Sequence, residues 1–88
     1  MNETEAAIRS IIVNDLFCEI PESEIGVDDG LRDVLALDSL GFLELRVACE
    51  QQFGVEISED DFTPEHFASI RSVSELVHRL RRTRLETA

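Results

Sequence analysis

The chain has 88 residues, with neither tryptophan nor tyrosine, and a formal net charge of −11 at pH 7. This length allows a single domain over residues 1–88 with one modest core, and leaves little room for a substrate cleft surrounded by catalytic groups. Such an acidic chain is a poor partner for nucleic acid or anionic membranes, and a good one for a basic protein patch. We therefore expect a carrier or a binding module, not an enzyme.

The acidic residues are concentrated in the middle of the chain. Residues 22–65 contain thirteen acidic side chains and only two basic ones, Arg32 and Arg46, so this stretch carries the whole net charge. A solvated acidic face is the alternative to a docking role for this stretch. Cys18 and Cys49 form no metal-type cluster and are expected to be reduced. The sequence shows no secretory leader or membrane-spanning run, which predicts a cytoplasmic protein.

The first helix is expected to begin after Asn2, which can form a capping box with Glu5, and to end at Pro21. Its apolar face consists of Ile8, Ile11, Ile12 and Leu16. A long loop over residues 19–38 should follow. Its isolated apolar residues are candidate anchors to the core: Ile20, Ile25, Val27, Leu31, Val34 and Leu35. Connections of this length inside a compact domain are more often functional than accidental.

The second helix should begin at Asp38 or Ser39 and end at Phe53, because Gly54 can adopt the left-handed conformation of a helix stop. Thr63 and Pro64 indicate the start of a short third helix over residues 64–68. A capping box of Ser72 and Glu75 should open the fourth helix, whose apolar face is Val73, Leu76, Val77 and Leu80 and whose tail carries Arg79, Arg81, Arg82 and Arg84. The predicted fold is all-α, a four-helix bundle with three long helices.

The second helix has two apolar faces. Phe42, Leu45, Cys49 and Phe53 fall in one stripe, and Leu40, Leu43 and Val47 fall in another on the far side. The first stripe can face the core, while the second has no obvious partner and is flanked by Glu44 and Glu50. An exposed apolar strip edged with acid is typical of a docking surface for a basic-rimmed protein. The alternative is that the first helix or the long loop covers this strip.

Ser39 lies at the start of this helix, beside unpaired backbone N–H groups that favour a phosphate. Asp-Ser at a helix start is usually only a cap. Here the run from Asp33 to Leu45, DVLALDSLGFLEL, followed by FGVEI, resembles the signature of acyl and peptidyl carrier proteins, which is built around an Asp-Ser-Leu triplet. The resemblance extends over nearly the whole chain, including its order of helices and loops.

The resemblance implies a covalent cofactor and a set of partners. Ser39, next to the motif residue Asp38, would carry 4′-phosphopantetheine transferred from coenzyme A by a separate phosphopantetheinyl transferase. The thiol of this arm would hold acyl or aminoacyl groups for loading enzymes and for downstream synthases or tailoring enzymes. Leu40, Leu43, Glu44, Val47 and Glu50 would form the docking surface of a monomeric carrier that binds no metal.

Two positions depart from the family pattern. Ala36 stands where many members have glycine, and alanine is expected to place slightly more strain on the backbone before the serine. Gly41 stands where fatty-acid carriers commonly have an acidic residue, and this favours polyketide, nonribosomal-peptide or related specialised biosynthesis over fatty-acid synthesis. Ile25, Leu35, Leu45 and Ile70 are candidates to line a space for cargo, although ordinary core packing explains them equally well.

Three other functions are weaker alternatives. A serine hydrolase would need a Gly-x-Ser-x-Gly turn, but position 37 is leucine and only His66 and His78 could act as bases. A calcium-binding helical protein would also be small and acidic, but the acidic clusters at residues 28–30 and 59–61 lack the ligand spacing of an EF-hand. An acidic helical adaptor that uses Leu40, Leu43 and Val47 without a prosthetic group is the strongest rival from a different functional class.

Overall fold

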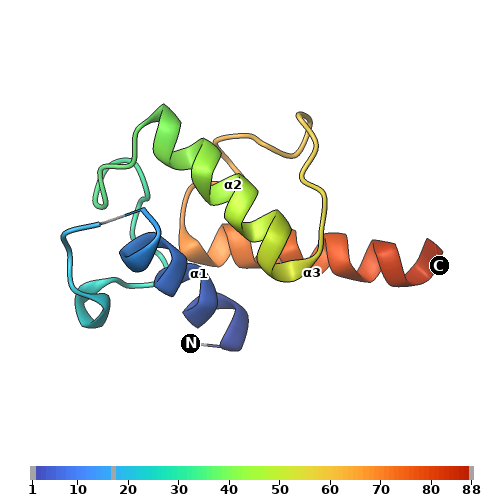
Figure 1. The fold of residues 1–88 in the computed structure, drawn as a ribbon, viewed down its shortest axis with the longest axis horizontal. Coiled ribbons are helices and arrows are strands. Elements are labelled where there is room, and N and C mark those ends of the chain that lie inside the picture. Colours follow the sequence, from blue (N-terminus) through green and yellow to red (C-terminus); the bar gives the residue numbers. More distant parts are fainter. Residues whose placement is uncertain (1, 17, 88) are drawn as a thin grey trace.

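Three α-helices enclose the core of the protein. The structure is a computed structural model that describes residues 2–16 and 18–87, with side chains described as far as Arg82. The described residues form helices α1 (Glu3–Asn14), α2 (Ser39–Phe53) and α3 (Ile70–Thr87), a single 3₁₀ turn η1 (Glu22–Glu24), and no strand (Figure 1). Helix α1 contacts α2, α3 and η1, and α2 also contacts α3. The prediction of an all-α fold is confirmed.

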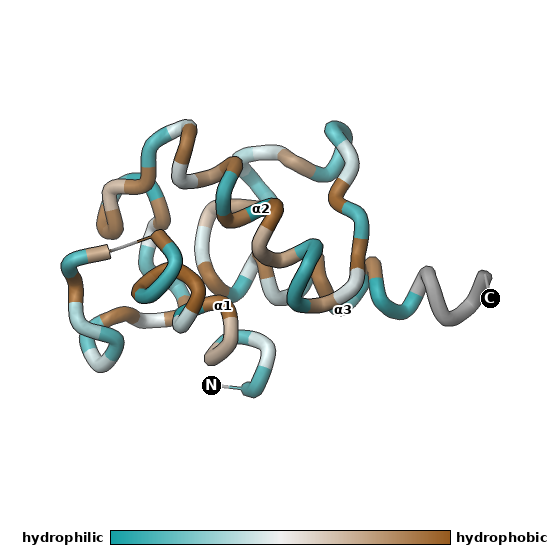
Figure 2. The backbone as a smooth tube through the Cα atoms, viewed as in Figure 1, coloured by the Kyte–Doolittle hydropathy of each residue, from teal (hydrophilic) through white to brown (hydrophobic). Residues whose placement is uncertain are grey.

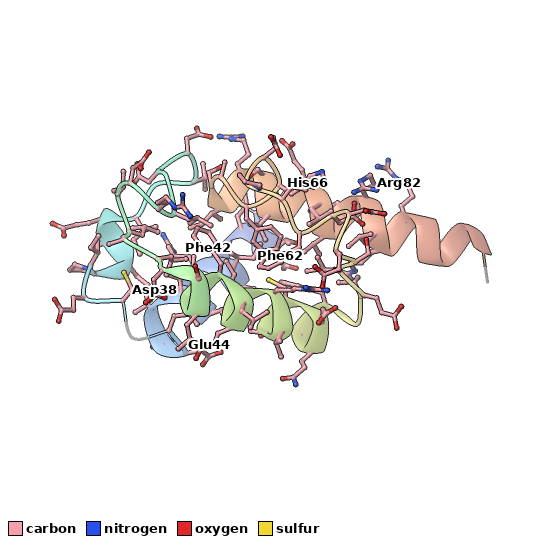
Figure 3. The ribbon with its side chains drawn as sticks, turned by 90° about the horizontal axis from the view of Figure 1, so that it is seen from above. Asp38, Phe42, Glu44, Phe62, His66 and Arg82 are labelled. Carbon is pink, nitrogen blue, oxygen red and sulfur yellow. The ribbon has the colours of Figure 1, made fainter. Side chains whose placement is uncertain are left out.

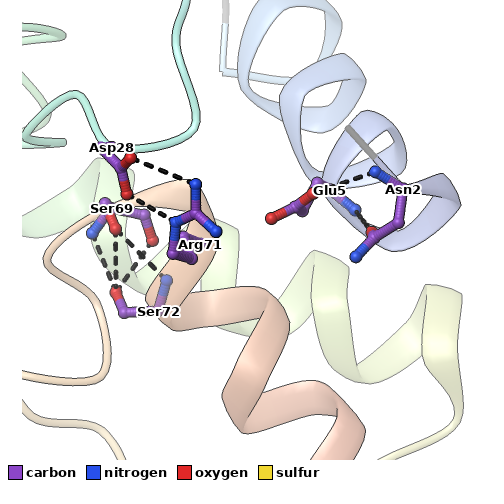
Figure 4. Close-up of polar contacts among 6 residues, drawn as sticks. All are labelled: Asn2, Glu5, Asp28, Ser69, Arg71 and Ser72. Atoms are coloured by element: carbon purple, nitrogen blue, oxygen red, sulfur yellow. Dashed lines mark hydrogen bonds and ion pairs between the residues drawn. The ribbon is translucent and has the colours of Figure 1, made fainter.

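Helix α1 begins as predicted. The Asn2 side chain accepts a hydrogen bond from the Glu5 amide at 2.8 Å, and the Glu5 carboxylate accepts one from the Asn2 amide at 2.9 Å (Figure 4). This capping box satisfies two amides at the helix start. Ile8, Ile11 and Ile12 are buried, so the predicted apolar face is the face that packs.

The end of α1 differs from the prediction, because the helix stops at Asn14 and not at Pro21. The amides of Asp15 and Leu16 both donate to the Ile11 carbonyl, and the Cys18 amide donates to the Ile12 carbonyl. These bonds close the last turn and bring Leu16 and Cys18 against the core, half-buried. Tertiary packing therefore ends the helix before proline has to.

The connection between α1 and α2 is long, and it is fastened at several points. Leu31 is fully buried, and its amide donates to the Ala68 carbonyl at 2.9 Å. The Arg71 amide donates to the Val27 carbonyl, and its guanidinium pairs with Asp28 at 2.6 Å (Figure 4). Ile25 and Leu35 are buried as predicted, but Val34 is 51% exposed, so its predicted role as an anchor is wrong.

Residues 64–68 form a hydrogen-bonded turn where a short helix was predicted. Thr63 behaves as expected of a cap: its hydroxyl accepts from the His66 amide and its carbonyl from the Phe67 amide. The turn does not propagate, because Ser69 already caps the next helix and Phe67 must enter the core, where it is 3% exposed. A single turn cannot offset the cost of helix nucleation.

Helix α3 starts earlier than predicted, at Ile70. The Ser69 hydroxyl accepts from the Ser72 amide, and the Ser72 hydroxyl accepts from the Ser69 amide at 2.9 Å (Figure 4). This reciprocal pair takes the place of the predicted Ser72–Glu75 box. Val73, Leu76 and Val77 are buried as predicted and Leu80 is partly buried. No helix within the described residues is both long and apolar enough to cross a membrane.

The core receives apolar side chains from all three helices and from the segments that join them. Figure 2, coloured by hydropathy, shows that both the helices and the segments between them contain apolar residues. The largest fully buried side chains include Ile8, Ile12, Leu31, Leu45, Ile57, Ile70 and Leu76. Leu45 and Cys49 hold one face of α2 against this core, which leaves the opposite face of α2 free.

Candidate functional site

Ser39 is the first residue of α2, and its side chain is exposed. Asp38 is the residue that caps the helix: its carboxylate accepts from the Gly41 amide at 2.8 Å, and its carbonyl accepts from the Phe42 amide at 2.9 Å. Because Asp38 supplies the cap, the Ser39 hydroxyl is not used for that purpose. The aspartate therefore holds the helix start in place while the serine hydroxyl faces solvent.

The backbone that leads to Ser39 makes a tight turn. The Leu35 amide donates to the Gly30 carbonyl at 3.1 Å, and the Leu37 amide donates to the Leu31 carbonyl at 2.9 Å. Between these bonds Ala36 has φ of 59°, a left-handed conformation that costs an alanine about 1–2 kcal/mol. The expectation that alanine strains the backbone here is thus confirmed. Buried Leu35 and Leu31 keep the turn in place against this strain.

A hollow of about 360 Å³ opens beside Ser39. Ser39 and Phe42 line it from α2, Arg32 and Asp33 from the long connection, and Phe62 and Phe67 from the segment before α3. Figure 3 shows Phe42 and Phe62 on the same side of α2, with Glu44 on the other side. Its lining is mainly apolar, with one cation and one anion. A hollow of this size is within the range of small-molecule sites.

Aromatic and ionic contacts hold Phe62, one of the residues that line this hollow. The Arg46 guanidinium lies 5.0 Å from the centre of the Phe62 ring and pairs with Glu59 at 3.3 Å. The Phe62 and Phe67 rings meet edge to face, with centroids 4.9 Å apart. These cation–π and aromatic contacts fix the position of Phe62.

Sequence reasoning missed this hollow. The four residues considered for a cargo space, Ile25, Leu35, Leu45 and Ile70, are all buried in the core and none lines it. Three of the five phenylalanines do line it, together with one of the only two cations in the acidic middle of the chain. Phenylalanines are scarce in this chain, and so are cations in its acidic middle. The positions of these residues were therefore the signal that could have indicated the hollow.

The predicted docking strip is exposed, as expected. Leu40 is 62% exposed, Leu43 47% and Val47 44%, so neither α1 nor the long connection covers them. Glu44 lies exposed beside them. Glu50 is placed differently, because it is half-buried and its carboxylate accepts a hydrogen bond from the Ile57 amide at 2.8 Å. Glu50 thus fastens the segment after α2, and its part in docking stays a prediction.

Asp28, Asp61 and His66 all make contacts that hold the connecting segments in place. Arg71 lowers the pKa of Asp28 through a hydrogen bond, and Arg79 does the same for the pKa of Asp61. These pairs tie the connecting segments to α3. The His66 Nδ1 lies 2.9 Å from the Asp61 carbonyl oxygen and 3.1 Å from the Thr63 hydroxyl, so the structure places this ring in the turn before α3.

Cys18 and Cys49 are both free thiols in the structure. Burial raises the pKa of the Cys49 thiol to about 12, with a smaller contribution from Glu50, so this thiol stays protonated and unreactive at neutral pH. Cys18 is half-buried near the end of α1. Within residues 2–16 and 18–87, no three histidine, cysteine or acidic side chains gather as a metal site.

The residues around Ser39 fit the prosthetic group that the sequence resemblance implies. An exposed hydroxyl at a capped helix start is accessible to a transferase, and the amino end of α2 favours the charge of a phosphodiester. The adjoining hollow leaves space for a flexible arm. The described side chains around Ser39 thus leave room for the group, with Arg32 and Asp33 as the two charges at the hollow.

Comparison with known proteins supports the same conclusion. The family model described as "Phosphopantetheine attachment site" matches residues 7–80. The chain is similar to an acyl carrier protein of Solidesulfovibrio magneticus, with 41% identity over 61% of this chain and 67% of that protein. It is also similar to acyl carrier protein 2 of Pseudomonas aeruginosa (34% identity, over 69% of this chain and 75% of that protein) and to an acyl carrier protein of Rhodococcus erythropolis (32%, over 78% and 70%).

Proposed function

The chain belongs to the phosphopantetheine attachment-site family, and on this basis we propose that Ser39 is the residue esterified by the arm. The observation that carries the proposal is the exposed Ser39 hydroxyl at the first residue of α2, with Asp38 doing the capping. The members of this family are non-catalytic carriers, and their cofactor is covalently attached 4′-phosphopantetheine. When attached, that cofactor supplies a thiol that holds acyl or aminoacyl groups as thioesters.

The protein's own residues have two tasks in this function. Asp38 and the strained turn at Ala36 hold Ser39 at a fixed place on the surface. Helix α2 presents Leu40, Leu43 and Val47 beside Glu44 to an enzyme that works on the arm. Such a surface suits short encounters, because acidic contacts in solvent speed association more than they prolong a complex.

Intact mass spectrometry tests the attachment site. The protein is incubated with coenzyme A and a broad-specificity phosphopantetheinyl transferase, and wild type is compared with Ser39→Ala. We expect wild type to gain the mass of one phosphopantetheine and Ser39→Ala to gain nothing. Ser23→Ala, which removes an exposed hydroxyl in η1, is the matched control and should be modified like wild type. No mass gain on wild type would overturn the proposal.

Charge reversal at Glu44 tests the docking surface. Glu44→Arg should lower kcat/KM of the transferase at low salt, because it places a cation next to the apolar strip that meets a basic partner. Glu22→Arg makes the same change in net charge on exposed η1 and should leave the rate unchanged. Equal rates for Glu44→Arg and wild type would mean that α2 is not the docking element.

We favour a carrier of specialised biosynthesis, such as polyketide or nonribosomal-peptide assembly. Gly41 supports this assignment, since the fatty-acid carriers commonly have an acid there, while fatty-acid synthesis stays the alternative. The expected partners are the transferase, an acyl- or aminoacyl-loading enzyme and downstream synthases or tailoring enzymes, with the carrier acting as a cytoplasmic monomer. Mass spectrometry of the arm on protein from its native host distinguishes the pathways by the group carried.

The rival function is an acidic adaptor without a prosthetic group. Its supporting observation is the exposure of Leu40, Leu43 and Val47, which would serve a protein partner equally well. The mass measurement on Ser39 separates the two, because an adaptor would not be modified.

A further inference from the structure

Gly41 is the third residue of α2, and the backbone there does not require a glycine. Its φ is not positive, unlike that of Gly54, so a residue with a side chain could adopt the same helical conformation. Glycine inside a helix is less favourable than alanine, because it loses more conformational freedom on folding. The reason for this glycine therefore lies in the space beside it.

That space is taken by the two residues that precede α2. A Cβ atom built on Gly41 would lie 3.3 Å from Leu37 Cδ2 and 3.4 Å from Asp38 Oδ1. Asp38 caps the amino end of the helix (Figure 3). Carbon atoms pack best at about 3.5–4.0 Å, so any side chain at position 41 would press on Leu37. Leu37 thus packs against a part of α2 that is open only because position 41 is glycine.

Leu37 is also fixed from the side of the core. Its amide donates to the Leu31 carbonyl at 2.9 Å, and Leu31 is fully buried with its own amide bonded to the Ala68 carbonyl. The Leu37 side chain is half-buried and packs against the core cluster. Leu37 therefore joins the turn before α2 both to the core and to the first turn of the helix.

On the premise that Ser39 is the attachment site, we propose that Leu37, in the space left by Gly41, is a positioning residue for the modification of Ser39. In this reaction the Ser39 oxygen bonds to the phosphorus next to the pantetheine, the diphosphate bond of coenzyme A breaks, the nucleotide leaves, and the transferase takes the hydroxyl proton. Leu37 lies two residues before Ser39 and prevents the backbone there from moving apart from α2. A hydroxyl held in one orientation reacts faster, because the reacting atoms are already aligned.

The kinetics of a broad-specificity transferase, with coenzyme A at saturation, test the proposal. Gly41→Ala should displace Leu37 by a few tenths of an ångström and lower kcat by about fivefold, less than the roughly hundredfold loss typical of a 1 Å misplacement. KM for the carrier should not change, because the docking strip on α2 is intact. Leu37→Ala should lower kcat by a similar factor. The double variant should also lose about fivefold and not twenty-fivefold, because no leucine remains to be displaced.

Gly26→Ala is the matched control. A Cβ atom there would also lie 3.3 Å from a neighbour, the Asp29 carboxylate, but outside the turn that precedes Ser39, so kcat should stay at the wild-type value. Urea unfolding at the assay temperature shows that each variant compared is folded.

Three results would contradict the positioning role. These are an unchanged kcat in either single variant, a loss in the double variant equal to the product of the two single losses, and a rise in KM alone, which would place Leu37 in the docking surface. Failure of wild type to be modified at all is a different result, and it would overturn the proposed function.

Discussion

Cys49 should make the protein lose stability in alkali, and the composition makes this effect easy to isolate. The thiol is fully buried, and burial raises its pKa to about 12, above the 9.0 expected in the unfolded chain. Between these values the unfolded thiol has lost its proton while the native one has kept it. The thiol's contribution is therefore complete below pH 9 and is lost as pH rises toward 12. From pH 9 to pH 11 the unfolding free energy should fall by about 2 kcal/mol.

Urea unfolding at pH 8, 9, 10 and 11 in the presence of a reductant measures this loss. The chain has no lysine and no tyrosine, so the side chains that usually titrate in this interval are absent. Cys49→Ala should be less stable at pH 8 because of the small cavity it leaves, but its stability should then stay nearly constant with pH. Cys18→Ala should keep the wild-type decline. If Cys49→Ala declined as steeply as wild type, the reasoning from burial would be refuted.

Three further substitutions are checked by the same urea unfolding. Ala36→Gly should stabilise the protein by about 0.5–1 kcal/mol, because glycine removes the strain of φ at 59° but adds freedom to the unfolded chain; equal or lower stability would contradict the strain. Asn2→Ala should cost about 1 kcal/mol by removing the cap of α1, and an unchanged midpoint would mean that the first turn is frayed in solution. Leu45→Ala should cost about 3 kcal/mol, since this side chain is fully buried; a loss below about 1 kcal/mol would mean that it lies outside the core.

The features of α2 could be predicted from sequence because local chemistry determines them. Asp38 caps the helix at one end, and Gly54 ends it at the other with φ of 66°. Each signal acts within a few residues of the boundary it sets. The two apolar stripes follow from helical spacing alone, and only the question of what covers the second stripe needed the structure.

The errors arose where packing into the core competes with a local helix signal. Thr63 has the chemistry of a helix cap, but Ser69 caps α3 only six residues later, and Phe67 between them is drawn into the core. Helix α1 ends before Pro21 for a similar reason, because packing of Leu16 and Cys18 sets its end. A local helix signal does not tell which neighbouring side chains the core will take up.

The hollow beside Ser39 was beyond sequence reasoning for a geometric reason. Its lining comes from three segments that are separate in the chain and meet only in the folded structure. Helical periodicity identifies which residues of α2 face the core, and says nothing about how the segments near Arg32 and Phe62 approach it. The attachment residue was therefore predictable, while its surroundings were not.

The exposed strip of Leu40, Leu43 and Val47 also has a colloidal consequence. An apolar surface that must stay open for partners is open to other copies of the same chain, and electrostatic repulsion between molecules of charge −11 keeps those copies apart. This repulsion vanishes near the isoelectric point of about 4.4. As the pH is lowered, the native protein should therefore aggregate through α2 well before it unfolds. A brief return to neutral pH should dissolve the aggregates.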